Sequence, residues 1–497
     1  MQYQNDPYSI LGLSKDASVE EVKIAYRRIA RRLHPDVNPN NPGAAAQFQE
    51  ITRSYEILMN AEQKRAYDVN ANAKNSNKLF KFSLRVTPSK RAITALQEQQ
   101  VVYLLAEILP DPLFRQGQQV RQSKINLALV LDKSNSMNGT RLDRVKVATH
   151  QIIDQLSEGD IFSVITFNDR AEVIINAGPV DNKPALKAKI SMMTASGGTE
   201  IYKGLSAGIE QVRRYLGPKL VNHVILLTDG HTFGDQVQCT DLAREAAKQG
   251  ISISALGLGQ EWNDEFLDEL ASITGGSSAY INSANAVVKF LNDHVRNLSN
   301  AFSERMRLSI APDPDVKLES VFRLSPNPQP LSTNEGNIQL GSLQTNRLIS
   351  VLMQFQMPVK MSLGFRSIAR LVVSGDIFAN QPQHFQALSD ISLEITERPI
   401  QEDPPSSILD ALGKLTLYRM QERAQAALAS GDVKEATQRL EHLATRLLAL
   451  GQGELANQAR AEARHAAHTN NLSDKGKKNL KYQTRLLLAQ SNMDGNE

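Results

Sequence analysis

Five side chains that carry oxygen are spaced along the chain as if three loops supplied one site. They are Asp132, Ser134 and Ser136 after one apolar run, Thr199 after a Gly-Gly pair, and Asp229 at the end of a second apolar run. Carboxylate and hydroxyl oxygens are the hard ligands that Mg²⁺ prefers, and Mg²⁺ keeps coordination positions for water or a partner. The pattern therefore indicates an Mg²⁺ site, to which Mn²⁺ or Ca²⁺ could also bind.

A purely structural interpretation of these loops stays open. Asp132 and Ser134 are of the residue types that cap the start of a helix, and Gly197 and Gly198 are typical of a turn. The chemistry of the side chains alone does not decide between a helix cap and a metal site.

Two histidines suggest a third interpretation, a hydrolytic metal centre. His223 and His231 flank Asp229. Single histidines are more often packing or surface residues, and no Ser/His/Asp or Cys/His signature accompanies these two. We therefore expect a protein that is not an enzyme, and keep metal-dependent hydrolysis only as a further candidate function.

A second chemically notable group is the tripeptide His34-Pro35-Asp36, which lies between two helical segments. Pro35 disfavours the helical conformation at His34, so the loop presents its polar side chains at its tip. The preceding helical segment carries Lys23, Arg27, Arg28, Arg31 and Arg32. Such a basic face suits an acidic partner and makes its association sensitive to salt. A capped turn with a solvated basic face is the alternative, because a tripeptide by itself recurs by chance.

Apolar residues at helical spacing position this loop. One set lies before the tripeptide and another after it, which predicts two antiparallel helices that bury these faces against each other. The first set is Val22, Ala25, Ile29 and Leu33, and the second is Phe48, Ile51, Tyr55 and Leu58.

Residues 6–68 closely resemble the J domain of DnaJ-type co-chaperones. The resemblance is carried by the segments DPYSILGL (6–13), AYRR (25–28), HPD (34–36), SYEIL (54–58) and KRAYD (64–68). It implies that the loop and the basic helix dock on a DnaK-type chaperone and stimulate its ATP hydrolysis. The residues to which it assigns this role are His34, Pro35, Asp36, Lys23, Tyr26, Arg27 and Arg28. The Gly/Phe-rich stretch and the cysteine-rich zinc repeats of the founding members are absent from the sequence, so any client-binding site must lie elsewhere.

Residues 123–300 alternate apolar strands with amphipathic helices, which predicts a doubly wound, mainly parallel sheet. The expected strands are 125–131, 161–167, 224–228 and 251–258, with a helix near 142–156. In such sheets ligands bind at the carboxyl edge, where Asp132 and Asp229 would lie.

This region resembles a von Willebrand factor type A domain with a metal-ion-dependent adhesion site, in which an Asp-x-Ser-x-Ser loop joins a distant Thr and Asp. The resemblance implies that the hydroxyls of Ser134, Ser136 and Thr199 are ligands and that Asp132 and Asp229 supply charge. It further implies that a carboxylate of a partner protein completes the coordination. Asn135 stands where the family often has Gly, and Asn tolerates a positive φ better than most residues.

Short alternating strands flank the α/β region on both sides, at 79–122 and 301–400. Each of these two segments is too small to form a stable domain alone. We expect the halves to pair into a β-sandwich into which the α/β domain is inserted. The full expected order is a J domain (1–70), a linker (71–78), the first sandwich half, the α/β domain (123–300), the second half, and a helical domain (401–497). The overall fold class is thus multidomain: all-α, α/β, β-sandwich and α-helical.

Composition excludes several other classes. The 497 residues contain 56 Lys plus Arg and 53 Asp plus Glu, and the resulting net charge of +3 gives no global case for nucleic-acid binding. Cys239 is the only cysteine, which excludes intramolecular disulfides and cysteine zinc sites. No apolar run is long enough to span a bilayer, and the polar start lacks the pattern of a secretory signal, so we expect a cytoplasmic protein.

The sequence therefore predicts a J-domain co-chaperone that recruits and stimulates a DnaK-type ATPase while a metal-dependent module binds a partner protein. The alternative is a scaffold or regulatory subunit of an ATPase or signalling complex that delivers no client.

Overall fold

The computed structural model describes residues 7–13, 17–39, 41–65, 67, 82–110, 123–217, 219–232, 234–333, 336–378, 383–398 and 403–490. The chain forms two compact units. The first, which we call the sandwich unit, comprises Met1–Ser123, Asn300–Arg323 and Pro330–Ile408. The second, the α/β unit, comprises Lys124–Ser299, Leu324–Gln329 and Leu409–Glu497. The predicted linker 71–78 lies outside the described residues.

The sandwich unit begins with the helices α1 (Pro7–Ile10), α2 (Val19–Leu33) and α3 (Pro42–Met59). Ser18 starts α2 with a reciprocal capping box to Glu21, and the Asn41 side chain caps α3. The apolar face predicted for α2 is buried, and Ile51 and Leu58 of α3 are buried with it in one cluster. The predicted helix pair is therefore confirmed.

The strands of the sandwich unit form two five-stranded sheets, in the orders β1-β3-β14-β11-β12 and β13-β10-β15-β16-β2. Strands β3 and β14 pair antiparallel with Leu105 opposite Leu352, so segments on both sides of the α/β insertion share one sheet. This confirms the predicted insertion. The strands are β1 (Phe82–Pro88), β2 (Ala92–Thr94), β3 (Gln100–Pro110), β10 (Ala301–Pro312), β11 (Lys317–Ser325), β12 (Gln329–Leu331), β13 (Asn337–Gln344), β14 (Ile349–Met357), β15 (Gly364–Ile377) and β16 (Gln383–Thr396).

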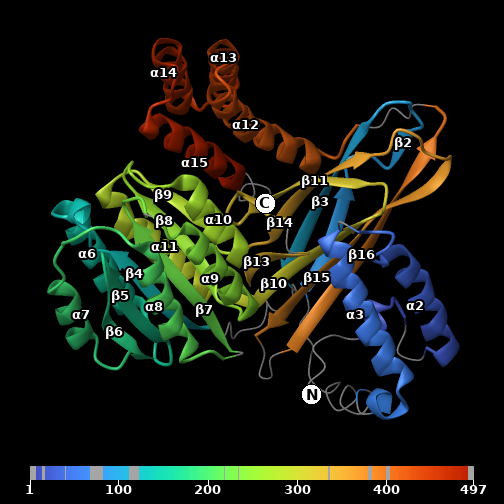
Figure 1. The fold of residues 1–497 in the computed structure, drawn as a ribbon, viewed down its shortest axis with the longest axis horizontal. Coiled ribbons are helices and arrows are strands. Elements are labelled where there is room, and N and C mark those ends of the chain that lie inside the picture. Colours follow the sequence, from blue (N-terminus) through green and yellow to red (C-terminus); the bar gives the residue numbers. More distant parts are fainter. Residues whose placement is uncertain are drawn as a thin grey trace. The chain divides into compact units, whose positions relative to one another are not determined.

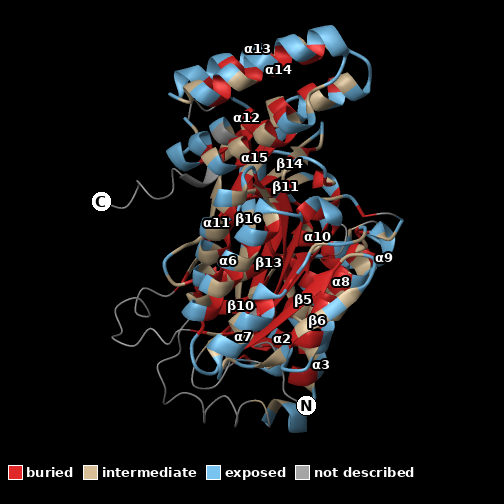
Figure 2. Ribbon diagram, turned by 90° about the vertical axis from the view of Figure 1, so that its left-hand side faces the viewer, coloured by how far each residue is buried: buried red, intermediate tan, exposed pale blue. Residues whose placement is uncertain are grey.

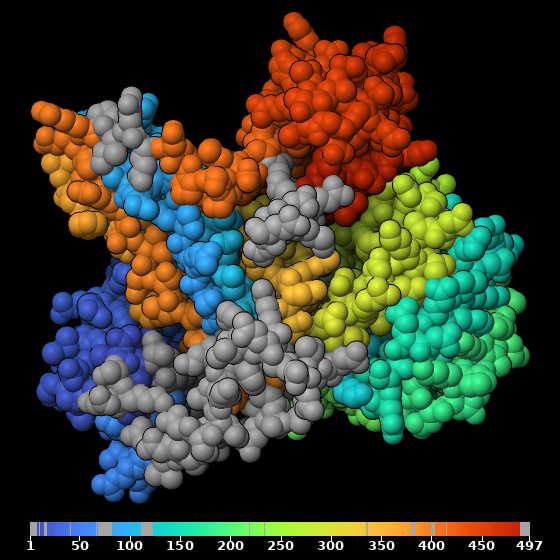
Figure 3. All heavy atoms as spheres, turned by 180° about the vertical axis from the view of Figure 1, so that it is seen from behind, coloured from blue at the N-terminus to red at the C-terminus, as the bar shows by residue number. Residues whose placement is uncertain are grey.

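The N-terminal helices pack directly on the sandwich. In Figure 3 the dark-blue atoms of these helices abut orange atoms of the sandwich strands. The buried Arg370 on β15 donates to the Ile10 carbonyl at 2.5 Å, and the buried amide of Gln47 on α3 donates to the Ser309 carbonyl at 3.3 Å. At Gly43 a Cβ atom would lie 1.8 Å from the Ile310 carbonyl oxygen, so only glycine allows this approach. No pattern in the sequence predicts this contact.

The α/β unit is built on a six-stranded sheet in the order β6-β5-β4-β7-β8-β9, parallel except for the β5–β6 pair. Helices α8, α9 and α10 cover one face, while α6 contacts both α7 and α11 in a second helical layer (Figure 1). The strands are β4 (Lys124–Asp132), β5 (Ile161–Phe167), β6 (Ala171–Pro179), β7 (Leu220–Thr228), β8 (Ser252–Leu258) and β9 (Ser278–Ile281). The helices are η1 (Asn135–Met137), α6 (Thr140–Gln155), α7 (Lys183–Ser191), α8 (Ile201–Arg213), α9 (Gln236–Lys248), α10 (Asp264–Thr274) and α11 (Ala284–Ser299). The doubly wound sheet matches the prediction.

Burial follows the layers. Figure 2 shows the central strands in red and the outer faces of the helices in pale blue. Strands β4 and β5 are buried along almost their whole length, as expected for central strands covered on both faces.

The C-terminal region consists of α12 (Ser406–Ala429), α13 (Val433–Ala449), α14 (Gly453–Thr469) and α15 (Asp474–Gln490), which confirms the predicted helical domain. Helix α15 is anchored on α10: Lys481 contacts Asp264 at 2.5 Å, and Arg485 contacts Asp268 at 2.6 Å. Tyr482 joins the core of the α/β sheet. Among the described residues, no helix is both long and apolar enough to cross a membrane.

Candidate metal-binding and chaperone-docking sites

Asp132 is the last residue of β4, the strand between β5 and β7 at which the strand order reverses. Its side chain is fully buried: Oδ1 accepts the backbone N–H of Ser134 at 2.8 Å, and Oδ2 accepts the Thr228 hydroxyl at 2.6 Å. Burial raises the pKa of Asp132, and the nearby charge of Asp229 acts in the same direction, while the hydrogen bonds from Thr228 and Ser134 oppose the rise. The carboxylate is therefore fixed by donors at the carboxyl edge of the sheet.

Ser134 and Ser136 connect the two carboxylates. Their hydroxyl oxygens lie 3.0 Å apart, and the Ser136 hydroxyl donates to Oδ1 of Asp229 at 2.7 Å. Asp229 directly follows β7 and is 1% exposed. The structure thus brings four of the five predicted residues into one hydrogen-bonded chain.

Thr199 comes from the third predicted loop. The Asn135 backbone N–H donates to the Gly197 carbonyl at 3.1 Å and ties this loop to the serine loop. A Cβ atom on Gly230 would lie 3.2 Å from Oγ1 of Thr199, so the threonine hydroxyl sits beside the loop that carries Asp229. Gly197 has φ +79°, a conformation that favours glycine. All five predicted residues therefore meet at one edge of the sheet.

Arg141 on α6 is a site residue that the sequence analysis missed. Its Nη1 contacts Oδ2 of Asp229 at 2.5 Å and donates to the Ser136 carbonyl at 3.2 Å. In the sequence, Arg141 is visible only as a basic residue five positions after Ser136. This spacing does not indicate that its side chain contacts Asp229. The site therefore holds two buried carboxylates and one arginine.

The donor set fits a hard cation. It contains two carboxylates and three hydroxyls, and Asp132 is held by hydroxyl and amide donors rather than by a cation. Within the described ranges, no three His, Cys, Asp or Glu side chains gather as a metal cluster, so a metal here would depend on the hydroxyls.

The histidines near Asp229 do not extend this site. His223 is buried, with Nε2 3.0 Å from the Ser254 hydroxyl and 3.4 Å from Nε2 of His294. His231 is exposed. The contacts of His223 are those of a packed core residue.

The second site is the loop after α2. His34, Pro35 and Asp36 are all exposed. Nδ1 of His34 accepts the backbone N–H of Asp36 at 3.2 Å, and the imidazole lies edge-on to the Phe48 ring at 5.4 Å. The loop therefore has an ordered shape and outward-facing polar groups.

The other predicted docking residues lie on α2. Arg27 and Arg28 are exposed, and Lys23 pairs with Glu20 at 2.9 Å. The ring of Tyr26 stacks on Tyr55 with centroids 4.2 Å apart, so this tyrosine also holds α2 against α3.

Arg32 belongs to the same basic helix but turns to the sandwich. It lies 3.1 Å from Asp390 and 3.7 Å from Asp313. Its charge is therefore already engaged within the sandwich unit.

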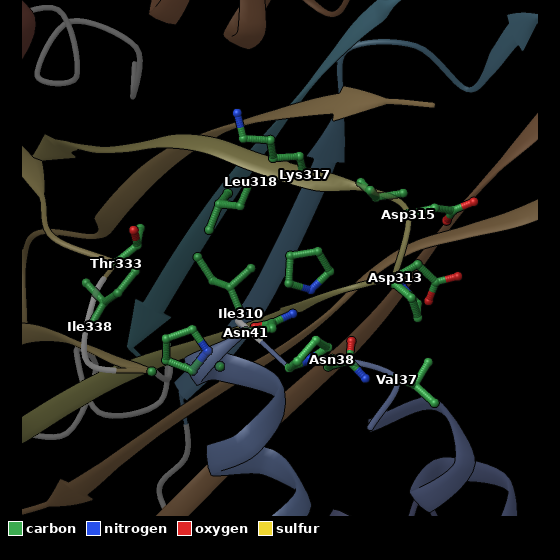
Figure 4. Close-up of a pocket in the computed structure, with 17 residues that line it drawn as sticks. Val37, Asn38, Asn41, Ile310, Asp313, Asp315, Lys317, Leu318, Thr333 and Ile338 are labelled. Carbon is green, nitrogen blue, oxygen red and sulfur yellow. The ribbon is translucent and has the colours of Figure 1, made fainter. Parts of the chain in front are cut away.

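A pocket of about 500 Å³ opens between the start of α3 and strands β10, β11 and β13 (Figure 4). Val37, Asn38 and Asn41 form one wall, and Ile310 and Leu318 face them. The two carboxylates of the pocket are already paired: Asp313 lies near Arg32, and Asp315 pairs with Arg366. The pocket therefore offers no free acid-base pair for chemistry.

Three family models match separate parts of the chain. The von Willebrand factor type A domain matches residues 126–294, and the DnaJ domain matches residues 6–68. The Sll0103-like, C-terminal alpha-helical domain matches residues 406–490. The first two confirm the J domain and the von Willebrand factor type A domain that the sequence predicted, and the third assigns the C-terminal helices.

Relatives with similar sequences fall into two groups. An uncharacterized protein, sll0103, from Synechocystis sp. is 30% identical over 323 residues, which cover 63% of this chain and 76% of that protein. The chaperone protein DnaJ of a Synechococcus strain is 57% identical over 63 residues, and that of Halothermothrix orenii is 43% identical over 82 residues. These matches cover 13% and 16% of this chain and only 16% and 22% of the DnaJ proteins.

Two solved structures share the fold of most of the chain. A von Willebrand factor type A protein from Catenulispora acidiphila has a TM-score of 0.65 at 18% identity and covers 82% of this chain and 97% of that one. The ArnB paralog VWA2 from Sulfolobus acidocaldarius has a TM-score of 0.54 at 14% identity and covers 82% and 99%. At these identities the likeness concerns the fold alone.

Proposed function

The chain belongs to the family of the Synechocystis protein sll0103, and we propose that it is a J-domain co-chaperone of that family. In this proposal the J domain recruits a DnaK-type chaperone and stimulates its ATP hydrolysis. The metal-ion-dependent adhesion site meanwhile binds a partner protein through an acidic residue. The observation that carries the proposal is the exposed His34-Pro35-Asp36 loop in a chain that also carries a converging set of oxygen ligands.

The J domain supports docking through shape and charge. The loop is ordered by its contact to Phe48, and Arg27 and Arg28 beside it are exposed. An acidic surface on the chaperone would relieve the repulsion among the cations of α2 and be steered to this helix. His34 contributes contacts at the tip rather than packing in the core.

At the adhesion site, the residues that would hold Mg²⁺ are Asp132, Ser134, Ser136, Thr199 and Asp229. A bound metal supplies a positive centre to which a carboxylate of the partner can attach. The chain itself orients the ligands: the Ser134 N–H and the Thr228 hydroxyl fix Asp132, and the Ser136 hydroxyl fixes Asp229.

The proposal assigns no enzymatic step to this chain. His223, which precedes Asp229 in the sequence, is engaged with Ser254 and His294 rather than with the serines and carboxylates of the site. The site is suited to binding a protein, and we propose that it acts in the cytoplasm together with the chaperone.

Single-turnover ATP hydrolysis by a cognate DnaK-type chaperone tests the proposal. We expect the full chain to accelerate hydrolysis and His34→Gln to abolish the acceleration while leaving the fold intact. The matched control is His465→Gln, at an exposed histidine of α14, which should accelerate like the wild type. Undiminished stimulation by His34→Gln would contradict the assigned role of the J domain.

A further inference from the structure

Arg141 stands at an electrostatically unfavourable position on its own helix. It is the second residue of α6, whose preceding residue Gly139 has φ +77°. Because the N-terminus of a helix carries partial positive charge, a cation in the first turn is disfavoured. A local reason for an arginine at this place must therefore lie outside α6.

The contacts of Arg141 supply that reason. Nη1 lies 2.5 Å from Oδ2 of Asp229 and 3.2 Å from the carbonyl oxygen of Ser136. The remaining oxygen of Asp229, Oδ1, accepts the hydroxyl of Ser136. One guanidinium thus holds the carboxylate that follows β7, together with the backbone of the serine loop.

The fold also leaves space for the guanidinium. Gly259 follows β8, and a Cβ atom there would lie 3.1 Å from Nη2 of Arg141. The side chain is 41% exposed, so it can leave Asp229 for solvent without repacking the core. The arginine is accommodated at the rim of the site and is free to move outward.

We propose that Arg141 is a tethered cation that competes with the divalent metal for Asp229 and so sets the metal affinity of the site. The inference rests on the metal site of the proposed function. A charge-assisted hydrogen bond to a carboxylate oxygen occupies one of its lone pairs, and the guanidinium offsets part of the negative charge that would attract the metal. With Arg141 present, the site therefore fills at higher metal concentrations than the same ligands would without it.

The test is the affinity of the full chain for Mg²⁺ and Mn²⁺, measured by isothermal titration calorimetry at fixed ionic strength. We expect Arg141→Gln to bind each metal about tenfold more tightly, because it removes the competing charge. Arg141→Met, which keeps the aliphatic length, should do the same. Arg144→Gln removes an exposed arginine from the same helix and should leave both affinities unchanged.

The measured metal affinities either support or contradict the competition between Arg141 and the metal. Affinity that is unchanged or weaker in both Arg141 variants would overturn the competition, since Arg141 would then be neutral or would help to orient Asp229. Binding by the Arg141 variants alone would support it. If neither the wild type nor any Arg141 variant binds metal, the proposed metal site itself fails, a result distinct from equal binding by all.

Discussion

Asp132 is one of the two carboxylates of the proposed metal site. It is fully buried, and its acceptor atoms are fixed by the Ser134 amide and the Thr228 hydroxyl. Burying a carboxylate is costly unless donors or a cation compensate it. A bound divalent cation would further compensate the buried negative charge and would therefore raise the melting temperature.

We expect Mg²⁺ at about ten times its dissociation constant to stabilise the α/β unit by about 1.4 kcal/mol, a rise in melting temperature of roughly 3 °C. Asp132→Ala should remove this shift, whatever its effect on the metal-free transition. Asp143→Ala, at an exposed carboxylate of α6, is the control and should keep it. Differential scanning calorimetry of the full chain is the measurement, and a shift that survives in Asp132→Ala would place the metal elsewhere.

The paired histidines give a pH dependence in the same unit. Burial lowers the pKa of His294 to about 4, and burial, with the neighbouring His294, lowers the pKa of His223 well below its ordinary value. Both side chains therefore stay neutral in the folded protein at pH values at which the same histidines of the unfolded chain are protonated. The stability that they contribute is complete above about pH 6.5 and is lost as the pH falls toward 4.

From the shift of His294 alone, we expect the free energy of unfolding to decline over this window by about 3 kcal/mol. In His294→Phe, which cannot be protonated, the decline should be smaller. Urea titrations followed by circular dichroism between pH 7 and 4 provide the measurement. Equal slopes in the variant and the wild type would mean that other groups cause the acid sensitivity.

At the residue scale the sequence predicted the five oxygen-bearing residues that meet at the candidate site, because they lie at or shortly after the end of a strand or after a glycine pair. It could not identify Arg141 or Thr228. Arg141 reaches Asp229 across 88 positions and Thr228 reaches Asp132 across 96, so only the assembled sheet brings each pair together.

At the scale of elements, the contact between the N-terminal helices and the sandwich depends on a few buried polar side chains. Arg370 donates to the Ile10 carbonyl, and Gln47 donates to both the Ser309 and Arg370 carbonyls. Burial lowers the pKa of Arg370, with the charge of Asp390 opposing that change. Removing one partner leaves the other buried group without its hydrogen bond.

We therefore expect Arg370→Ala to loosen α1 and α3 from the sandwich at a cost of about 1–3 kcal/mol. Hydrogen exchange should rise in residues 7–13 and 42–51, while stimulation of the DnaK-type ATPase persists because the loop tip is untouched. Lys360→Ala, at an exposed site in the same unit, should not change exchange. Unchanged exchange in Arg370→Ala would show that the contact adds no stability.

Helix periodicity predicted the helices of the N-terminal and C-terminal regions, since their apolar faces recur every three to four residues. It could not predict where α15 docks. That contact is made by Lys481, Tyr482 and Arg485 on Asp264 and Asp268, more than 200 positions away in the sequence. On a single helix these side chains are indistinguishable from an ordinary solvated face.

At the scale of the whole molecule, the chain order itself carries information. Strands before and after the α/β insertion were each too few for a domain, which predicted that they pair, and β3 with β14 confirms it. The chain thus combines a J domain, an inserted von Willebrand factor type A domain and the Sll0103-like helices. What the combination does depends on whether the two proposed sites act on the same protein.

A co-chaperone that delivers a client requires both sites for one outcome, whereas a scaffold does not. His34→Gln should still capture partners at the metal site but fail to pass them on. Asp229→Ala should still stimulate ATP hydrolysis but capture no partner. The two variants therefore fail for different reasons under the proposed function.

The most direct measurement is quantitative mass spectrometry of the proteins that copurify with the DnaK-type chaperone from a lysate containing Mg²⁺ and the full chain. We predict that a defined set of proteins is loaded on the chaperone with the wild type, and that both His34→Gln and Asp229→Ala lose this set. The same set should remain bound to His34→Gln itself. Loading that is indifferent to His34 would contradict the co-chaperone account and favour a scaffold that holds its partners without delivering them.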